Sequence, residues 1–120
     1  MRADLNGDEE SDFIDVFSLA LDENNLFPSL AVVSLNRGGH RRPIRAFSHS
    51  GRFPDMLQVR VVDLNNDGKK ELLIGRVNAG VSHSYLEVQI YRMNNEDGLE
   101  LIKEMWFQDQ SLDEIMETEF

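Results

Sequence analysis

The sequence predicts an all-β chain made of two repeat units of four strands each, followed by a short tail. Three observations predict this fold class. An acidic stretch that begins at Asp4 as DLNGDEESDFI returns at Asp63 as DLNNDGKKELLI. Each copy is followed by runs rich in β-branched and aromatic residues that partly alternate between apolar and polar positions. Segments rich in Gly, Pro, Asn and Asp separate these runs and predict turns.

Composition and charge exclude several classes of protein. The 120 residues, 41% of them hydrophobic, suit one soluble domain. A formal net charge of −10 repels phosphate backbones, which excludes a nucleic-acid partner. No apolar run is long enough to span a bilayer and no secretory signal opens the sequence, so we expect no membrane insertion. Because there is no cysteine, disulfides, thiolate zinc sites and cysteine nucleophiles are also excluded.

Residues 1–50 are predicted to form the first unit. Its first strand is cut short within MRADL at the chain start and leads into the first acidic loop. Three further strands are expected at residues 12–20, 29–36 and 43–49, with the turn segments DENNLFP and RGGHRR between them.

Residues 51–107 are predicted to repeat this arrangement. A strand at 57–64 leads into the second acidic loop, and strands at 71–77, 85–93 and 99–107 follow. The last two strands are joined through NNEDG, where Asp97-Gly98 is a strong turn signal. Each unit therefore has four strands, with the acidic loop between the first and the second.

The tail, residues 108–120, has two equally supported interpretations. Ser111 and Glu114 form a capping-box pattern, and Leu112, Ile115 and Met116 share one helical face, which predicts a short helix. The run of acidic residues without a basic one is equally typical of a frayed, solvated chain end.

Both acidic loops carry oxygen-bearing side chains at relative positions 1, 3, 5 and 9, a spacing that predicts calcium binding. Calcium takes about 6–8 oxygen ligands, and a tightly curled loop turns positions 1, 3 and 5 inward together. A peptide carbonyl at position 7 adds an oxygen, and position 9 closes the shell from the start of the next strand. The candidate metal ligands are Asp4, Asn6, Asp8, Asp12 and the Glu10 carbonyl in the first loop, and Asp63, Asn65, Asp67, Glu71 and the Lys69 carbonyl in the second. The Lys69 side chain itself is expected to point into water.

The two loops differ at position 6, where a sharp turn favours glycine. Gly68 occupies this position in the second loop and Glu9 in the first, so the turn should cost about 1 kcal/mol more in the first loop. We therefore expect the first loop to be the weaker site. An EF-hand is excluded because position 12 is Asp15 or Ile74 instead of Glu, and strands flank the loops.

The segment VRVVDLNNDGKKELLIG closely resembles the FG-GAP and VCBS repeats, which are similar to the propeller repeats of integrin α subunits. The resemblance covers nearly the whole chain as two blade-like units. It implies that the side chains at positions 1, 3, 5 and 9 of each loop are calcium ligands, with Glu71 in place of the usual Asp. Complete propellers of this family generally have seven blades. Three accounts are therefore open: a piece of a larger propeller, assembly with other copies, or closure of the strands into a small sandwich or barrel.

Other residues favour ordinary structural roles. His40, His49 and His83 show no spacing typical of a zinc site, and no serine lies in a nucleophile-elbow motif. Residues 37–45, RGGHRRPIR, are interpreted as a solvated loop that could contact an acidic partner. Trp106 is expected to be a core or inter-blade anchor.

The function that these observations favour is a non-enzymatic, calcium-stabilised β-repeat module for adhesion or for binding a protein or glycan. As part of a larger protein it would lie outside the cell, in the periplasm or on the cell surface, where millimolar calcium fills even weak sites. One alternative is an accessory repeat of a secreted hydrolase, or a carboxylate pair that itself cleaves a glycan. Another is an intracellular scaffold of the same fold with reduced dependence on metal.

Overall fold

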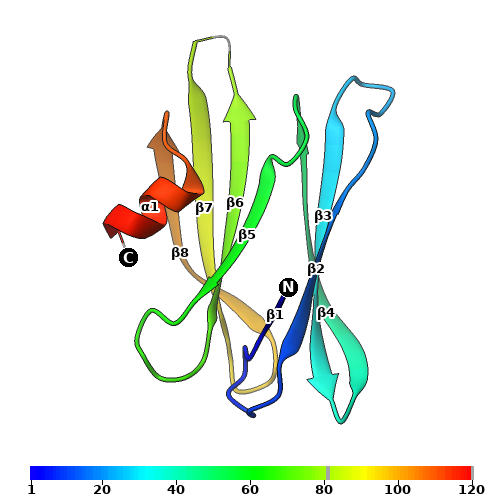
Figure 1. The fold of residues 1–120 in the computed structure, drawn as a ribbon, viewed down its shortest axis with the longest axis vertical. Coiled ribbons are helices and arrows are strands. Elements are labelled where there is room, and N and C mark those ends of the chain that lie inside the picture. Colours follow the sequence, from blue (N-terminus) through cyan, green and yellow to red (C-terminus); the bar gives the residue numbers. More distant parts are fainter. Residues whose placement is uncertain (81, 120) are drawn as a thin grey trace.

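The computed structural model describes residues 1–80 and 82–119, and in this part the chain forms two antiparallel four-stranded sheets and one helix (Figure 1). The strands follow sequence order within each sheet. This confirms the predicted all-β architecture of two units. The first sheet contains β1 (Arg2–Ala3), β2 (Asp12–Ser18), β3 (Phe27–Arg37) and β4 (His40–Gly51); the second contains β5 (Leu57–Val62), β6 (Glu71–Ala79), β7 (Ser84–Met93) and β8 (Leu99–Gln108).

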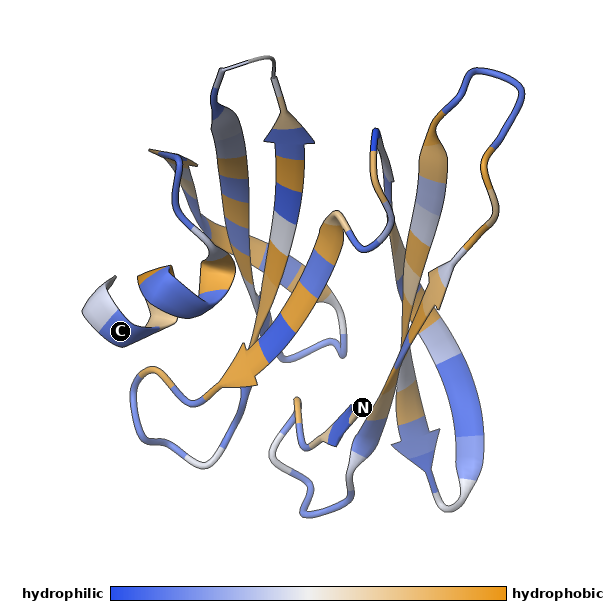
Figure 2. Ribbon diagram, turned by 45° about the horizontal axis from the view of Figure 1, so that its top comes forward, coloured by the Kyte–Doolittle hydropathy of each residue, from blue (hydrophilic) through white to orange (hydrophobic). Residues whose placement is uncertain are grey.

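The alternation of side chains along the strands sorts them onto two faces of each sheet. In β7, Leu86, Val88 and Ile90 are buried, while Glu87 and Gln89 between them are partly exposed. Figure 2 shows the resulting bands of hydrophobic and hydrophilic residues along β6 and β7. β7 therefore offers one apolar row to a neighbouring layer, whereas β6 is buried on both faces from Glu71 to Gly75.

The main core lies between the two sheets, which pack face to face. The sheets do not join through strand pairing in the described residues, so the closed barrel that the sequence left open is not formed. The core side chains that both sheets contribute are Ala3, Leu5, Ile14, Ala31, Val33, Leu35 and Phe47 from the first unit and Leu57, Val59, Leu72, Ile74, Tyr91 and Met93 from the second.

The helix α1 (Leu112–Glu119) packs on the other face of the second sheet (Figure 1). Ser111 caps it by accepting the N–H of Glu114 at 3.1 Å, and Leu112 and Ile115 are buried against Leu73 and its neighbours. The helical interpretation of the tail is thus confirmed, and the frayed one is wrong; Phe120 lies outside the described residues. In the described part, α1 is too short and too polar to cross a membrane.

Two expectations about individual segments are wrong. Trp106 is 65% exposed on the edge strand β8, so it anchors neither the core nor the contact between the two units. Residues 40–45 are part of strand β4 and not of a loop, although Arg41, Arg42 and Arg45 are exposed as expected. The Arg45 guanidinium lies over the Tyr91 ring at 5.3 Å.

Candidate metal-binding loops

The two acidic loops lie at the same end of the molecule, one between β1 and β2 and the other between β5 and β6 (Figure 1). Their backbones follow the same path, because the residues at positions 4 and 6 are left-handed in both loops. These are Gly7 (φ 77°) and Glu9 (φ 68°) in the first loop, and Asn66 (φ 58°) and Gly68 (φ 85°) in the second. The sharp turn predicted at position 6 is therefore present in both loops, with glycine in only one.

Asp63 organises the second loop. Its Oδ1 accepts the N–H of Asp67 at 3.1 Å, and its Oδ2 accepts the N–H of Gly68 at 2.8 Å. Partial desolvation acts to raise the pKa of Asp63, but the N–H donors of Gly68, Asp67 and Asn66 and the charge of Lys70 together hold it below its usual value. The carboxylate is therefore ionised at neutral pH.

Glu71 closes the second loop from the first position of β6. Its side chain is 1% exposed, and Oε2 accepts the N–H of Leu64 at 2.9 Å. Its other oxygen, Oε1, lies 3.3 Å from Nη2 of Arg92 on β7. Sequence reasoning missed Arg92, because its approach depends on the pairing of β6 with β7.

The second loop brings three carboxylates together. Ligand atoms of Asp63, Asp67 and Glu71, at positions 1, 5 and 9, all lie within 4.8 Å of one another. Such a group of hard oxygen donors can hold a divalent cation, although the donors alone do not distinguish calcium from magnesium or manganese. Asn65, at position 3, is exposed on the same loop.

Lys69 contributes its backbone to the loop and its side chain to the first unit. Its N–H donates to Oδ1 of Asp67 at 2.9 Å. The side chain is half-buried, and a Cβ added at Gly7 would lie 2.9 Å from Cε of Lys69. The expectation that this side chain points into water is therefore wrong, because the neighbouring loop covers it.

The first loop is held by internal hydrogen bonds of the same kind. Asp4 accepts the N–H groups of Gly7 at 2.8 Å and Glu9 at 3.0 Å. The side chain of Asn6 accepts the N–H of Asp8, and that of Asp8 accepts the N–H of Glu10. Each predicted side chain at positions 1, 3 and 5 is thus engaged with the loop backbone.

Asp12 differs from Glu71 in how its carboxylate is used. It is fully buried, and its two oxygens accept the N–H groups of Leu5 and Asn36, both at 2.9 Å. Burial raises the pKa of Asp12 above its usual value, although these two donors oppose the shift. In the part of the chain that the structure describes, the acids of the first loop do not gather as those of the second loop do.

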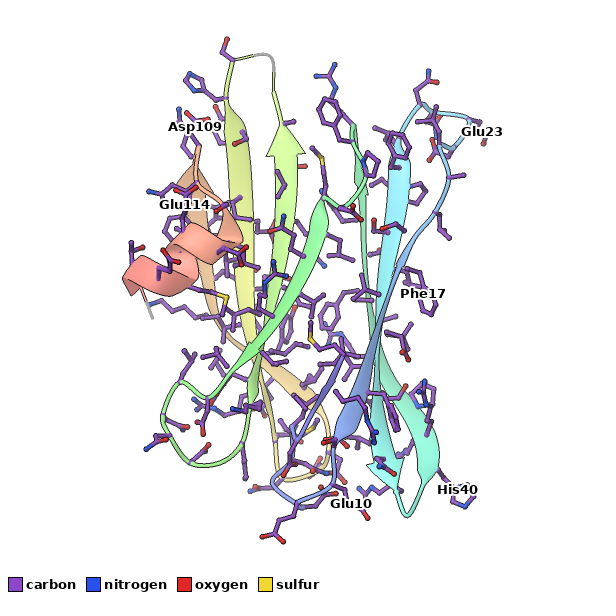
Figure 3. The ribbon with its side chains drawn as sticks, viewed as in Figure 1. Glu10, Phe17, Glu23, His40, Asp109 and Glu114 are labelled. Carbon is purple, nitrogen blue, oxygen red and sulfur yellow. The ribbon has the colours of Figure 1, made fainter. Side chains whose placement is uncertain are left out.

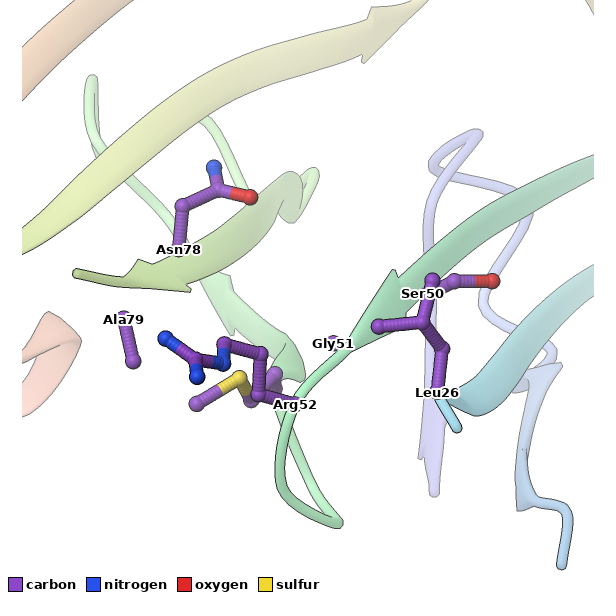
Figure 4. Close-up of a pocket in the computed structure, with 7 residues that line it drawn as sticks. Leu26, Ser50, Gly51, Arg52, Asn78 and Ala79 are labelled. Carbon is purple, nitrogen blue, oxygen red and sulfur yellow. The ribbon is translucent and has the colours of Figure 1, made fainter. Parts of the chain in front are cut away.

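A cavity of about 210 Å³ opens between the ends of β4 and β6 (Figure 4). Among the described residues, Arg52 is the one charged residue in its lining, which offers neither a carboxylate nor a histidine for acid–base chemistry. The other residues that line it are Leu26, Ser50, Gly51, Met56, Asn78 and Ala79.

Comparisons of the chain with protein-family models, with curated proteins and with solved structures found no match.

Proposed function

We propose that this chain is a non-catalytic β-repeat module in which the second loop binds calcium and fixes β5 to β6. The observation that carries this proposal is the convergence of Asp63, Asp67 and Glu71 within 4.8 Å. These are the positions at which the D-x-N-x-D-G-x-x-E spacing places ligands.

The number of oxygen ligands that the loop can offer favours calcium over magnesium. The ligands are all oxygens, and the Asn65 amide and Lys69 carbonyl would raise their number toward the 6–8 that calcium takes. Magnesium needs stricter octahedral geometry and retains its water more strongly. The spacing of the ligands along this loop also resembles that of calcium-binding repeats.

A bound cation would hold β5 and β6 together. Glu71 belongs to β6, whereas Asp63 follows β5, so an ion held by both joins the two strands. It would also offset the mutual repulsion of three carboxylates. At a free concentration 100 times the dissociation constant, the gain in folding free energy is about 2.7 kcal/mol.

The wider role that we propose is adhesion, or the binding of a protein or glycan, by a larger protein outside the cytoplasm that carries further repeat units. Millimolar calcium in that environment would keep even a weak loop filled. The exposed faces of the sheets, and not the metal loop, would then supply the binding surface.

Isothermal titration with calcium, and separately with magnesium, tests the proposal. We expect calcium to bind with one strong site that Asp67→Asn removes. Glu96→Gln is the matched control, because Glu96 is an exposed acid in another turn. Absence of heat and of any shift in melting temperature at millimolar calcium would refute the proposal.

A further inference from the structure

One face of the first sheet points away from the second sheet and is called here the open face. Its apolar centre is made by Phe17, Leu30, Val32 and Ala46. Phe17 is paired with Leu30, and Val32 with Ala46, so the four side chains are neighbours on one side. The alternate residues Ala31 and Val33 face the core, which places these four on the opposite side. Phe17 is 50% exposed and points away from the second sheet in Figure 3.

The two units use different faces to meet each other. Ile14 and Leu73 are equivalent, since each lies two residues after the buried acid at position 9. Ile14 packs in the core between the sheets, whereas Leu73 packs under α1. Conversely, Leu72 faces the first sheet, while its equivalent Phe13 lies on the side of the open face.

The equivalence extends across each sheet. Both sheets carry a β-bulge at the same place, between Val33 and Ser34 in the first and between Ile90 and Tyr91 in the second. This register makes Val33 in the core between the sheets equivalent to Ile90, which is buried on the face that α1 covers. The contact between the units is therefore head-to-tail, with one kind of face meeting the other kind.

Head-to-tail packing leaves one face of each kind at the two ends of the pair. At one end is the open face, and at the other end is the face of the second sheet that contains Leu73 and Ile90. These two faces are equivalent to the pair that already pack together inside the molecule. They are thus complementary halves of an interface that the fold has already formed once.

α1 covers the face of the second sheet that contains Leu73 and Ile90, as a terminal capping element does in a repeat protein. Leu112 and Ile115 are buried on the sheet, while Asp113 and Glu114 face solvent and make the outer surface polar. Nε of Arg60 on β5 donates to Oδ1 of Asp113 at 3.1 Å. The helix is eight residues long, so it covers this face with few side chains.

We propose that the open face docks a second copy of this chain through the face that α1 covers, and that α1 blocks this self-association. The inference rests on the repeat geometry and does not depend on the metal. Because β1 has two residues where β5 has six, the contact between copies buries less than the contact within the chain. Its affinity should be micromolar or weaker even when α1 is displaced.

Sedimentation of the full-length variant Leu112→Asp/Ile115→Asp tests the proposal. The parent chain should remain monomeric at all concentrations, whereas the weight-average mass of the variant should rise with concentration. Adding Phe17→Asp to the variant should return it to a monomer, because this substitution places a charge in the open face. A variant that stays monomeric with a native circular dichroism spectrum would overturn the proposal, and so would aggregation that Phe17→Asp leaves unchanged.

A mixing experiment separates the two halves of the interface. In the triple variant Leu112→Asp/Ile115→Asp/Phe17→Asp, the face of the second sheet is exposed and the open face is disrupted. In the parent, the open face is intact and α1 covers the second sheet. A mixture of the two should therefore give a 1:1 complex. Parent carrying Phe17→Asp is the matched control and should bind at least about tenfold more weakly. Equal binding of the two would contradict the assignment of the open face.

A milder substitution covers the case in which the double variant does not fold. Asp113→Arg removes the contact with Arg60 and places a positive charge in the first turn of α1, where negative charge is favoured, without altering a buried side chain. It should open the helix more often and give measurable association at high concentration. If Asp113→Arg opens α1 by hydrogen exchange and the chain still remains monomeric, the proposal is wrong.

Discussion

The backbone N–H of Lys70 donates a hydrogen bond to the carbonyl oxygen of Asp4 at 3.0 Å, which joins the two acidic loops across the interface between the units. The side chain of Lys69 lies against Gly7 beside this bond. The two loops are therefore in direct contact. If calcium fixes the second loop, the first loop should also become less mobile.

Hydrogen exchange measures this coupling. We expect calcium to slow exchange at the N–H groups of Gly7 and Glu9 as well as at those of Asp67 and Gly68, because the loops share a hydrogen bond. Asp67→Ala should abolish the slowing in the second loop and most of the slowing in the first. Protection confined to the second loop would show that the contact between Lys70 and Asp4 does not carry the effect.

Thermal melting compares how much each loop contributes to stabilisation by calcium. Saturating calcium should raise the melting temperature by about 5–15 °C, which corresponds to a gain of about 2.7 kcal/mol. Asp67→Ala should remove most of this rise and Asp8→Ala a smaller part, because only the second loop gathers its carboxylates. Equal losses in the two variants would contradict this ranking, and a chelator should reverse the rise in the parent.

Arg92 would compete with a bound cation for Glu71, because its guanidinium lies 3.3 Å from Oε1. Replacing it in Arg92→Met frees Oε1 of Glu71, so calcium should bind several-fold more tightly by calorimetry. Without calcium the same variant should be less stable by about 1–3 kcal/mol, because a buried carboxylate oxygen loses its partner. Lys103→Met, which alters an exposed side chain on β8, is the control, and a similar change in affinity there would point to net charge as the cause.

Position 6 has a left-handed backbone in both loops, but Glu9 occupies it in the first loop and Gly68 in the second. Glu9→Gly should stabilise the chain by up to about 1 kcal/mol in urea denaturation, since glycine adopts this conformation without steric strain. Gly7→Ala should have the opposite effect, about 1–2 kcal/mol, because its Cβ is strained at φ 77° and meets Lys69. A destabilising Glu9→Gly would mean that the Glu9 side chain makes a compensating contact.

Asp109 makes stability depend on acid pH. The N–H of Ser84 and the His83 ring, 2.8 Å from Oδ2, hold the pKa of Asp109 below its usual value of 3.8. The folded pKa is lower than the unfolded one, so this contribution is complete above about pH 4 and is lost as the pH falls through the folded pKa. Asp109→Asn should flatten this part of the pH profile in urea denaturation, and His83→Gln should flatten it less. A profile that is unchanged in Asp109→Asn would exclude this cause.

The candidate site was predictable from the sequence where its geometry is local. The N–H donors to Asp63 and Asp4 come from residues at most five positions away, so the spacing of the loop already contains them. The partners of the buried acids were not predictable, because Arg92 and Asn36 come from other strands. Their approach follows from strand register.

The sequence by itself determined the two units, their strands and the left-handed turn at position 6, because these depend on alternation, turn residues and hydrogen bonds between near neighbours. For the tail it left a capped helix and a frayed end equally supported. Tertiary structure decided which loop gathers its carboxylates, why Trp106 is exposed and which sheet face α1 covers. The physical reason is that burial is set by the layer that lies opposite a residue. That layer comes from segments distant in the chain, and the two equivalent faces of a repeat carry the same local pattern whether or not they are covered.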